Sequence, residues 1–234
     1  MLTLRRLVFA TWLYLSILIA GVLYIPFLLG TRRLNNRLIA LWACTVRFGL
    51  RLIMGVRIEV RGLEHRPTGA SLIAAKHQSM LDTVAPFLFL EDPCFVMKKE
   101  LLSMPFIGWY GAKAGMIAVD REAHASALKG LVRDARDRLR QARELVIFPE
   151  GTRTEPGAEP DYKPGVAALY RDLEMPCHLM ATNSGSHWPA HGIRFNPGVV
   201  VFEFLPPVPA GLKRGEFMRE LVERVEGASS RLRG

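Results

Sequence analysis

Cysteine is scarce in this chain of 234 residues, and several common functional motifs are missing from it. The three cysteines, Cys44, Cys94 and Cys177, are odd in number and show no metal or redox spacing. This pattern argues against a disulfide framework and indicates a reducing compartment. The chain has no Gly-x-Gly-x-x-Gly fingerprint and no Walker A motif, so no nucleotide-binding fold is expected. Without a Gly-x-Ser-x-Gly elbow, covalent serine catalysis is the weaker option.

Recognised zinc-ligand spacing is absent as well. The nearest candidate is the group Cys177, His178, His187 and His191. Pro189 lies between His187 and His191 and disfavours a regular helix there. On a strand, the adjacent Cys177 and His178 would point to opposite faces. We therefore expect no metal site and no cofactor.

Acidic residues are outnumbered in this sequence. The 31 Lys and Arg against 22 Asp and Glu give a net charge of +9, and 50% of the residues are hydrophobic. A basic, apolar chain prefers a surface rich in phosphate, either nucleic acid or an anionic bilayer. No RNP-like, zinc-finger or helix-turn-helix signature is present, so we expect an anionic membrane surface as a partner and no nucleic acid.

Charged residues are absent between positions 7 and 30. As a helix this run would be about 36 Å long, against a hydrocarbon core of about 30 Å, so it could span a bilayer. A cleaved signal peptide is the main alternative, since Arg5 and Arg6 precede the run. The run is longer than a typical signal core, lacks a small-x-small cleavage site and ends before Arg32 and Arg33. These features favour a membrane helix.

The next segment, residues 34–54, is amphipathic. On a helix with about 100° per residue, four arginines fall within an arc of about 80°, opposite an apolar face. Such a helix can lie in the membrane interface or pack on the domain with its arginines in water, and the preceding apolar helix favours the membrane. The basic stripe is Arg33, Arg37, Arg47 and Arg51, and the apolar face is Leu38, Trp42, Gly49 and Ile53.

We therefore expect two parts. Residues 1–54 would form a two-helix membrane anchor, and residues 55–234 would form a domain at the cytoplasmic face of the inner membrane. Basic residues flank both ends of the first helix. The positive-inside rule therefore does not choose between a single crossing and a re-entrant hairpin.

Beyond residue 55, short β-rich runs alternate with helical patterns. This alternation predicts an α/β fold with a central mixed or mostly parallel sheet flanked by helices. The arginines of helix 122–142 are interleaved with acids, which is typical of a solvated face. The predicted strands are 56–61, 71–75, 94–97, 116–119, 145–148, 178–182 and 199–204, and the predicted helices are 82–90, 105–113, 122–142, 165–171 and 215–231.

A first candidate motif, residues 77–82 (His-Gln-Ser-Met-Leu-Asp), follows the predicted strand 71–75. The end of such a strand is where α/β proteins usually place reactive groups. His77 and Asp82 can meet if the chain turns between them and Asp82 caps the next helix. Asp82 would then fix the ring tautomer, and the other nitrogen of His77 could accept a proton from a hydroxyl. The alternative is a capping aspartate beside a histidine that only hydrogen-bonds in a turn.

A second motif, residues 148–153 (Phe-Pro-Glu-Gly-Thr-Arg), ends the predicted strand 145–148. Gly151 lets the backbone approach a ligand closely, and Thr152 supplies a hydroxyl. Arg153 offers a planar fork that fits a phosphate. Glu150 could hold an arginine in place or accept a hydrogen bond from a glycerol hydroxyl. The alternative is an ordinary polar turn with Arg153 in water.

Both motifs resemble those of the glycerolipid acyltransferases, the His-x4-Asp and Phe-Pro-Glu-Gly-Thr-Arg motifs. Residues 115–121, Gly-Met-Ile-Ala-Val-Asp-Arg, resemble the family's strand that ends in Asp-Arg, and Lys98 is similar to a lysine that helps to bind the acceptor phosphate. The resemblance covers about residues 56–207. The chain departs from the family in two places, because residues 175–179 lack the second proline of a Val-Pro-x-x-Pro run and Ala118 replaces an aromatic residue.

The resemblance implies direct transfer of an acyl chain from acyl-CoA or acyl carrier protein to the 2-hydroxyl of lysophosphatidic acid (1-acylglycerol-3-phosphate), giving phosphatidic acid without an acyl-enzyme. His77 would be the general base and Asp82 its orienting partner. The alternatives are acylation of another lyso-lipid such as a lyso-ornithine lipid, acylation of glycerol-3-phosphate, and lipid binding without catalysis. The residues implied in acceptor binding are Lys98, Arg121, Glu150, Gly151, Thr152 and Arg153.

Overall fold

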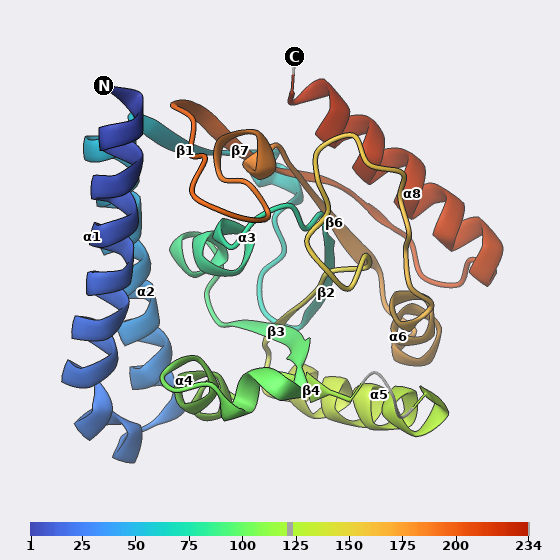
Figure 1. The fold of residues 1–234 in the computed structure, drawn as a ribbon. Coiled ribbons are helices and arrows are strands. Elements are labelled where there is room, and N and C mark those ends of the chain that lie inside the picture. The colour runs from blue at the N-terminus through green and yellow to red at the C-terminus, as the bar shows by residue number, and fades with distance from the viewer. Residues whose placement is uncertain (121–123, 234) are drawn as a thin grey trace.

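The structure, a computed structural model, describes residues 1–120 and 124–233. Its centre is a seven-stranded sheet with the order β1-β7-β6-β2-β5-β3-β4 (Figure 1). All neighbouring strands pair in parallel except β6 and β7, which are antiparallel. The expected α/β class with a mixed, mostly parallel sheet is confirmed. The strands are β1 (Val56–Arg61), β2 (Ser71–Ala75), β3 (Pro93–Lys98), β4 (Ile117–Val119), β5 (Glu144–Ile147), β6 (Cys177–Thr182) and β7 (Gly198–Val208).

Helices cover both faces of this sheet, with α5, α6 and α8 on one side and α1, α2 and α3 on the other (Figure 1). The longer helices are α1 (Leu2–Leu23), α2 (Arg32–Gly49), α5 (His124–Arg140), α6 (Gly165–Leu173) and α8 (Arg214–Arg231). The short ones are α3 (Leu81–Val84), α4 (Ile107–Lys113) and α7 (Ser184–His187). Short 3-10 helices are η1 (Ile25–Leu29), η3 (Leu63–His65), η4 (Ala85–Leu88) and η5 (Lys99–Ser103), and η2 (Leu50–Met54) is a short π-helix.

The central strands β2 and β5 are buried on both faces because helices cover both faces of the sheet. In β2, Leu72 and Ala74 pack beneath α5, α6 and α8, whereas Ile73 and Ala75 pack against the opposite helical layer. Side chains alternate along a strand, so one buried strand contributes to two cores.

The N-terminal residues form an antiparallel helical hairpin. The side chain of Arg5 donates to the carbonyl of Ile53, and the indole of Trp42 donates to Ser16. Within the described residues, α1 is the one helix long and apolar enough to cross a membrane, and most of it is exposed. The hairpin arrangement brings the chain back to the end of α1 from which it started (Figure 1).

The sequence of helix α2 allowed two interpretations, a helix in the membrane interface and a helix packed on the domain. The four arginines of the stripe, three in α2 and Arg51 in η2, are exposed, as expected. The buried side chains Ala43 and Val46 of α2 join the same core as Ile73 of β2. The hairpin is also held by polar contacts, since Arg32 and Asn36 both donate to Asp92. The hydrophobic core therefore includes residues from both sides of the expected boundary at residue 54.

Candidate active site

Four parallel strands, β2, β5, β3 and β4, lie side by side and end at the same edge of the sheet. Neighbouring strands are about 4.8 Å apart, so residues that follow them are brought together. His77 follows β2, the segment Phe148–Arg153 follows β5, and Lys98 ends β3. Arg121 follows β4 in sequence but lies outside the described residues. The fold therefore gathers residues that are far apart along the chain.

His77 and Asp82 meet at this edge. The Nδ1 atom of His77 lies 3.1 Å from Oδ2 of Asp82. That oxygen also accepts the backbone N–H groups of Gln78 at 2.6 Å and Ser79 at 2.8 Å. The carboxylate thus binds the turn that precedes it in the chain, and the Asp82 side chain is fully buried. Helix α3 begins at Leu81, so Asp82 lies within the first turn rather than at the expected capping position.

The imidazole of His77 is held from a second side by an aromatic ring. The rings of His77 and Phe148 stack with their centroids 4.0 Å apart and an angle of 18° between their planes. Only 13% of the His77 side chain is exposed, and it lines a cavity. With Nδ1 directed at Asp82, Nε2 is the nitrogen left to accept a proton. The arrangement can serve as a general base whose tautomer and orientation are both fixed.

The second motif forms a turn beside His77. Gly151 has φ +69°, a backbone conformation that favours glycine, and its N–H donates to the carbonyl of Phe148. Thr152 and Arg153 are exposed and line the same cavity as His77. The backbone N–H of Thr154 donates to the carbonyl of His77 at 2.9 Å. The two motifs are therefore joined directly, and Arg153 and His77 face one space.

Glu150 lies in a different position from the one the sequence suggested. Its side chain is fully buried, and the described cavity lining does not include it. Its Oε1 lies 2.9 Å from the ammonium of Lys76 and accepts from Thr154 and, at 3.4 Å, from the backbone N–H of His77. Burial raises the pKa of the Glu150 carboxyl, and the charge of Lys76 opposes that rise. Glu150 is therefore placed to hold the two motifs together, not to touch a ligand in the cavity.

Lys76 is a site residue that the sequence pattern did not single out. It is 3% exposed and lies immediately before His77. Its ammonium also lies 2.6 Å from Glu226 of α8, which in turn accepts from the hydroxyl of Tyr162. One buried cation thus ties β2, the second motif and α8 together. The sequence did offer one signal, because Lys76 directly follows an apolar strand. A lysine buried at such a position needs a carboxylate partner.

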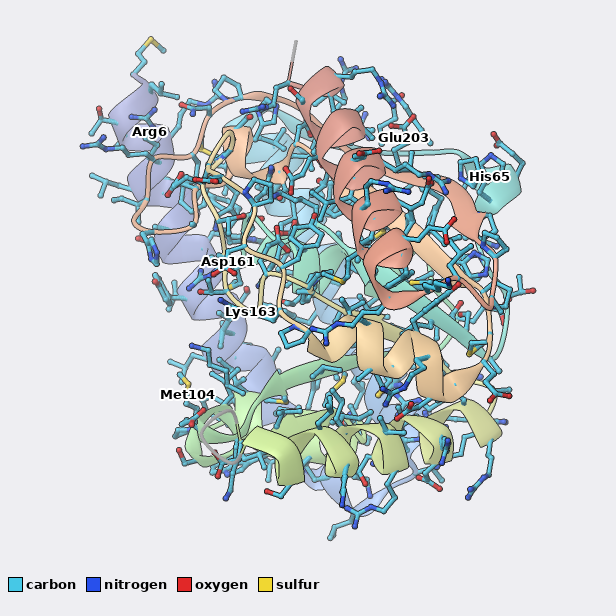
Figure 2. All side chains as sticks on the ribbon, turned by 90° about the vertical axis from the view of Figure 1, so that its right-hand side faces the viewer. Arg6, His65, Met104, Asp161, Lys163 and Glu203 are labelled. Carbon is cyan, nitrogen blue, oxygen red and sulfur yellow. The ribbon has the colours of Figure 1, made fainter. Side chains whose placement is uncertain are left out.

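The cavity in front of His77 has a volume of about 1060 Å³. Its walls are mostly apolar and come from α1, α2, β3, α4, α5 and the start of α6. Among the described residues, the basic side chains of Lys98, Arg153 and Lys163 line it as well. Lys163, labelled in Figure 2, was not singled out from the sequence. Its backbone N–H donates to the carbonyl of Pro149. The cavity thus combines a cationic region with a long apolar one, as a molecule with an anionic head and a hydrocarbon tail requires.

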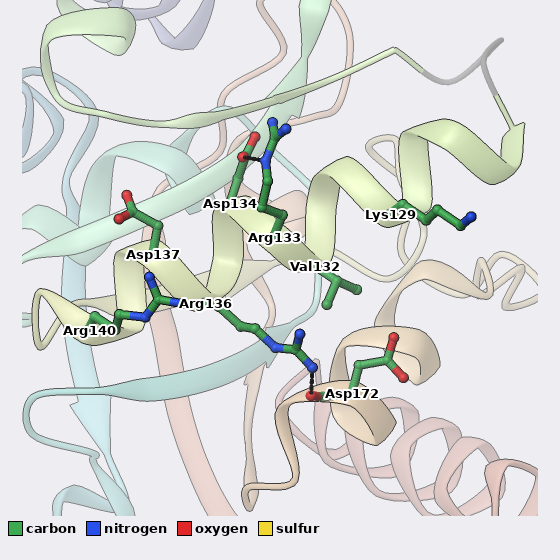
Figure 3. Close-up of a pocket in the computed structure, with 8 residues that line it drawn as sticks. All are labelled: Lys129, Val132, Arg133, Asp134, Arg136, Asp137, Arg140 and Asp172. Atoms are coloured by element: carbon green, nitrogen blue, oxygen red, sulfur yellow. Dashed lines mark hydrogen bonds and ion pairs between the residues drawn. The ribbon is translucent and has the colours of Figure 1, made fainter.

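A second hollow, of about 590 Å³, lies over α5 and α6 (Figure 3). Its lining side chains are all charged except Val132, and they largely neutralise one another. Arg133 pairs with Asp134 at 2.9 Å, and Arg136 donates to the carbonyl of Asp172 (Figure 3). This is the solvated charged face expected for the helix, and it holds no histidine, serine or cysteine among its described lining residues.

The residues weighed as a zinc site are dispersed. Burial raises the pKa of the Cys177 thiol to about 12 and lowers that of His178, which contacts the carbonyl of His65. His187 contacts the backbone carbonyls of Asn196 and Pro197 instead. Within residues 1–120 and 124–233, no group of three or more His, Cys, Asp or Glu side chains is arranged to hold a metal ion.

The sequence is similar to known proteins over most of its length. Residues 57–183 match the family described as Acyltransferase. A 1-acyl-sn-glycerol-3-phosphate acyltransferase from Pseudomonas aeruginosa is 35% identical over 216 residues, which are 92% of this chain and 81% of that protein. A protein of the same description from Helicobacter pylori is 38% identical over 146 residues, 61% of this chain and 58% of its own.

The fold is also similar to a solved structure. The crystal structure of the 1-acyl-sn-glycerophosphate (LPA) acyltransferase from Thermotoga maritima aligns with a TM-score of 0.81 over 100% of this chain and 98% of that one. The two sequences are 21% identical in this alignment, so the likeness concerns the fold. It includes the N-terminal hairpin, because the alignment covers the whole chain.

Proposed function

We propose, from the premise that this chain belongs to the acyltransferase family, that it acylates the 2-hydroxyl of 1-acyl-sn-glycerol-3-phosphate. The product would be phosphatidic acid, and the acyl donor would be the thioester of acyl-CoA or acyl carrier protein. The observation that carries this proposal is the pairing of His77 and Asp82 at the wall of a cavity with apolar and basic parts.

His77 would act as the general base. Its Nε2 takes the proton of the 2-hydroxyl while that oxygen attacks the thioester carbonyl. The tetrahedral intermediate then expels the thiolate, which takes the proton back from the imidazolium. The Asp82 carboxylate stabilises the imidazolium and keeps Nδ1 protonated, as the 3.1 Å contact allows. No acyl-enzyme is needed, because the acceptor oxygen attacks the thioester carbonyl directly.

The acceptor phosphate would bind at the basic part of the cavity. Arg153 can form a bidentate pair with a phosphate, and Lys98 supplies a second positive charge. Gly151 and Thr152 would add a backbone and a hydroxyl contact from the same turn. Arg121, which follows β4, remains part of this proposal on sequence grounds alone. An uncharged acceptor would leave these cations without a partner, and this favours a phosphate-bearing lipid.

The membrane would supply the acceptor. One face of α1 is exposed and apolar, while four exposed arginines lie along α2 and the following element η2. This combination supports binding to an anionic leaflet, with residues 1–54 as the anchor and residues 55–234 at the cytoplasmic face. The apolar part of the cavity reaches Ile17 and Trp42 of the two anchor helices. An acyl chain could therefore pass between bilayer and cavity without crossing water.

An acceptor panel tests the proposal. Purified protein is given radiolabelled acyl-CoA or acyl carrier protein and one acceptor at a time: 1-acylglycerol-3-phosphate, glycerol-3-phosphate, a lyso-ornithine lipid or lysophosphatidylcholine. We expect labelled phosphatidic acid and release of free thiol with the first acceptor. Equal or faster acylation of a different acceptor would refute the proposed substrate. Failure to release thiol with every acceptor would leave only lipid binding.

A further inference from the structure

Exposed apolar side chains are concentrated in two places on this protein. Outside residues 1–54, the described chain exposes six large hydrophobic side chains, at Leu63, Leu102, Met104, Ile107, Trp109 and Ile193. Four of these six fall within residues 102–109, the segment that spans the end of η5 and the start of α4. Their exposed fractions are 37% for Leu102, 43% for Met104, 47% for Ile107 and 46% for Trp109. Scattered single residues are ordinary, but such a cluster marks an interaction surface.

The cluster is continuous with the exposed face of α1. The ring of Phe106 packs on the backbone of α1 at Gly21, where an added Cβ would lie 2.6 Å from the ring. The hydroxyl of Tyr110 donates to the carbonyl of Gly21 at 2.7 Å, and Asn35 of α2 donates to the carbonyl of Tyr110. Met104 lies at the same edge of the molecule as α1 (Figure 2). Segment 102–109 is thus fixed to the end of the hairpin.

The cavity lies between these two apolar surfaces. Gly21 of α1 and Tyr24, which follows that helix, line it on one side, and Leu101, Phe106 and Ile107 line it on the other. Leu102, Met104 and Trp109 are not among its lining residues and therefore face outward. A lipid that enters between α1 and segment 102–109 would have apolar surface on both sides of its path.

The charges next to the segment fit an anionic bilayer better than a second protein chain. Lys98 and Lys99 precede the segment and are exposed, with Lys99 lying 3.4 Å from Asp120, and Lys113 follows the segment at the end of α4. Glu100 is the one acidic residue between positions 98 and 113. Exposed apolar side chains bordered by basic residues are characteristic of membrane-surface elements.

We propose that residues 102–109 form a third lipid-facing element, which inserts into an anionic leaflet beside the α1–α2 hairpin and borders the entrance for the lipid acceptor. The role at the entrance rests on the proposed function, whereas insertion does not. Trp109 would lie at the level of the headgroups, the usual depth of tryptophan in a membrane interface.

Fluorescence quenching tests insertion. Wild-type protein and Trp109→Phe are mixed with vesicles of phosphatidylcholine and phosphatidylglycerol, with and without brominated acyl chains. We expect part of the wild-type quenching to be lost in Trp109→Phe, because Trp12, Trp42 and Trp188 remain in both proteins. Equal quenching in the two proteins would overturn the proposal, since Trp109 would then not reach the lipid.

A matched pair of double variants tests the contribution to binding. Leu102→Ser/Met104→Ser removes two apolar side chains from the segment, and Leu63→Ser/Ile193→Ser removes two exposed ones from elsewhere. We expect the first variant to bind the same vesicles about tenfold more weakly and the control to bind like the wild type. Equal binding by both variants would contradict insertion, as would a wild-type dimer that the first variant dissociates without any change in vesicle binding.

The same variants separate the entrance from the proposed activity. With 1-acylglycerol-3-phosphate embedded in vesicles, Leu102→Ser/Met104→Ser should be slower than the wild type. With the acceptor dispersed in detergent, the two rates should be equal. Equal rates in vesicles would refute the role at the entrance. If the wild type forms no phosphatidic acid under either condition, the proposed function fails, and the quenching result alone decides insertion.

Discussion

Replacing Lys76 by methionine removes the one cation that contacts Glu150 within the described residues. The two side chains are 3% and 0% exposed, and their charged atoms are 2.9 Å apart. Without the ammonium, the Glu150 carboxylate stays buried next to a backbone N–H donor from His77 and a hydroxyl donor from Thr154. Breaking a buried ion pair from one side costs about 3–5 kcal/mol. In a chain of this size, that loss corresponds to a fall in melting temperature of about 6–20 °C.

The partner substitution should be milder. In Glu150→Gln, Lys76 keeps its 2.6 Å contact with Glu226, so no buried charge is left alone. In Lys76→Met/Glu150→Gln both charges of the pair are gone, and most of the loss caused by Lys76→Met should be recovered. A thermal double-mutant cycle in the same detergent measures these differences.

The pH dependence has a defined sign. Burial already raises the pKa of Glu150 above its usual 4.5, and removal of Lys76 raises it further. A carboxyl with a raised folded-state pKa loses stability as pH rises from the unfolded pKa through the folded one. Lys76→Met should therefore be closest to the wild type near pH 5 and furthest from it near pH 8. A variant as stable as the wild type at pH 8, or a double variant no better than Lys76→Met, would refute the role of this pair.

Three further predictions concern the site and the core. Asp82→Asn should lower kcat by about 10²- to 10⁴-fold with little change in acceptor KM, because an amide cannot hold the required tautomer of His77; a mainly raised KM would contradict this. Arg153→Ala should raise the KM for 1-acylglycerol-3-phosphate more than it lowers kcat, and an unchanged KM would remove Arg153 from the phosphate site. A small neutral thiol reagent at pH 8 should label Cys44 of the native protein quickly, since Cys94 and Cys177 are buried and burial raises their thiol pKa values; rapid labelling of three thiols would contradict the fold.

The strands were predictable because they are short apolar runs that end at recognisable breaks. β1 and β2 have the predicted bounds, and β3 to β6 differ from them by a residue or so at each end. β7 is longer than predicted and runs through two prolines to Val208, because it pairs with β1 on one side and β6 on the other. α7 was missed, since a helix of four residues carries no periodic pattern. The strand order was not predictable, because it depends on crossover connections that leave no local signal.

The site was predictable in its local parts only. The turn that brings Asp82 to His77 follows from five residues of sequence. The Lys76–Glu150–Glu226 network joins positions as much as 150 residues apart, and no local pattern indicates such a contact. The same reason explains why the position of Glu150 was not predicted. Its sequence motif suits ligand binding, but its side chain pairs with Lys76. Helix α2 illustrates both cases. Its exposed arginines were predictable from helical periodicity, whereas the contact of the buried Asn36 with Asp92 was not.

The most direct test of the account is the rate of acyl transfer by His77→Ala, measured as labelled phosphatidic acid from 1-acylglycerol-3-phosphate and acyl-CoA. His65→Ala serves as the matched control, since it removes an imidazole that does not line the cavity. We predict a rate about 10²- to 10⁴-fold below wild type for His77→Ala, with an unchanged melting temperature, and a wild-type rate for His65→Ala. A His77→Ala protein that is folded and transfers acyl chains at nearly the wild-type rate would contradict the account.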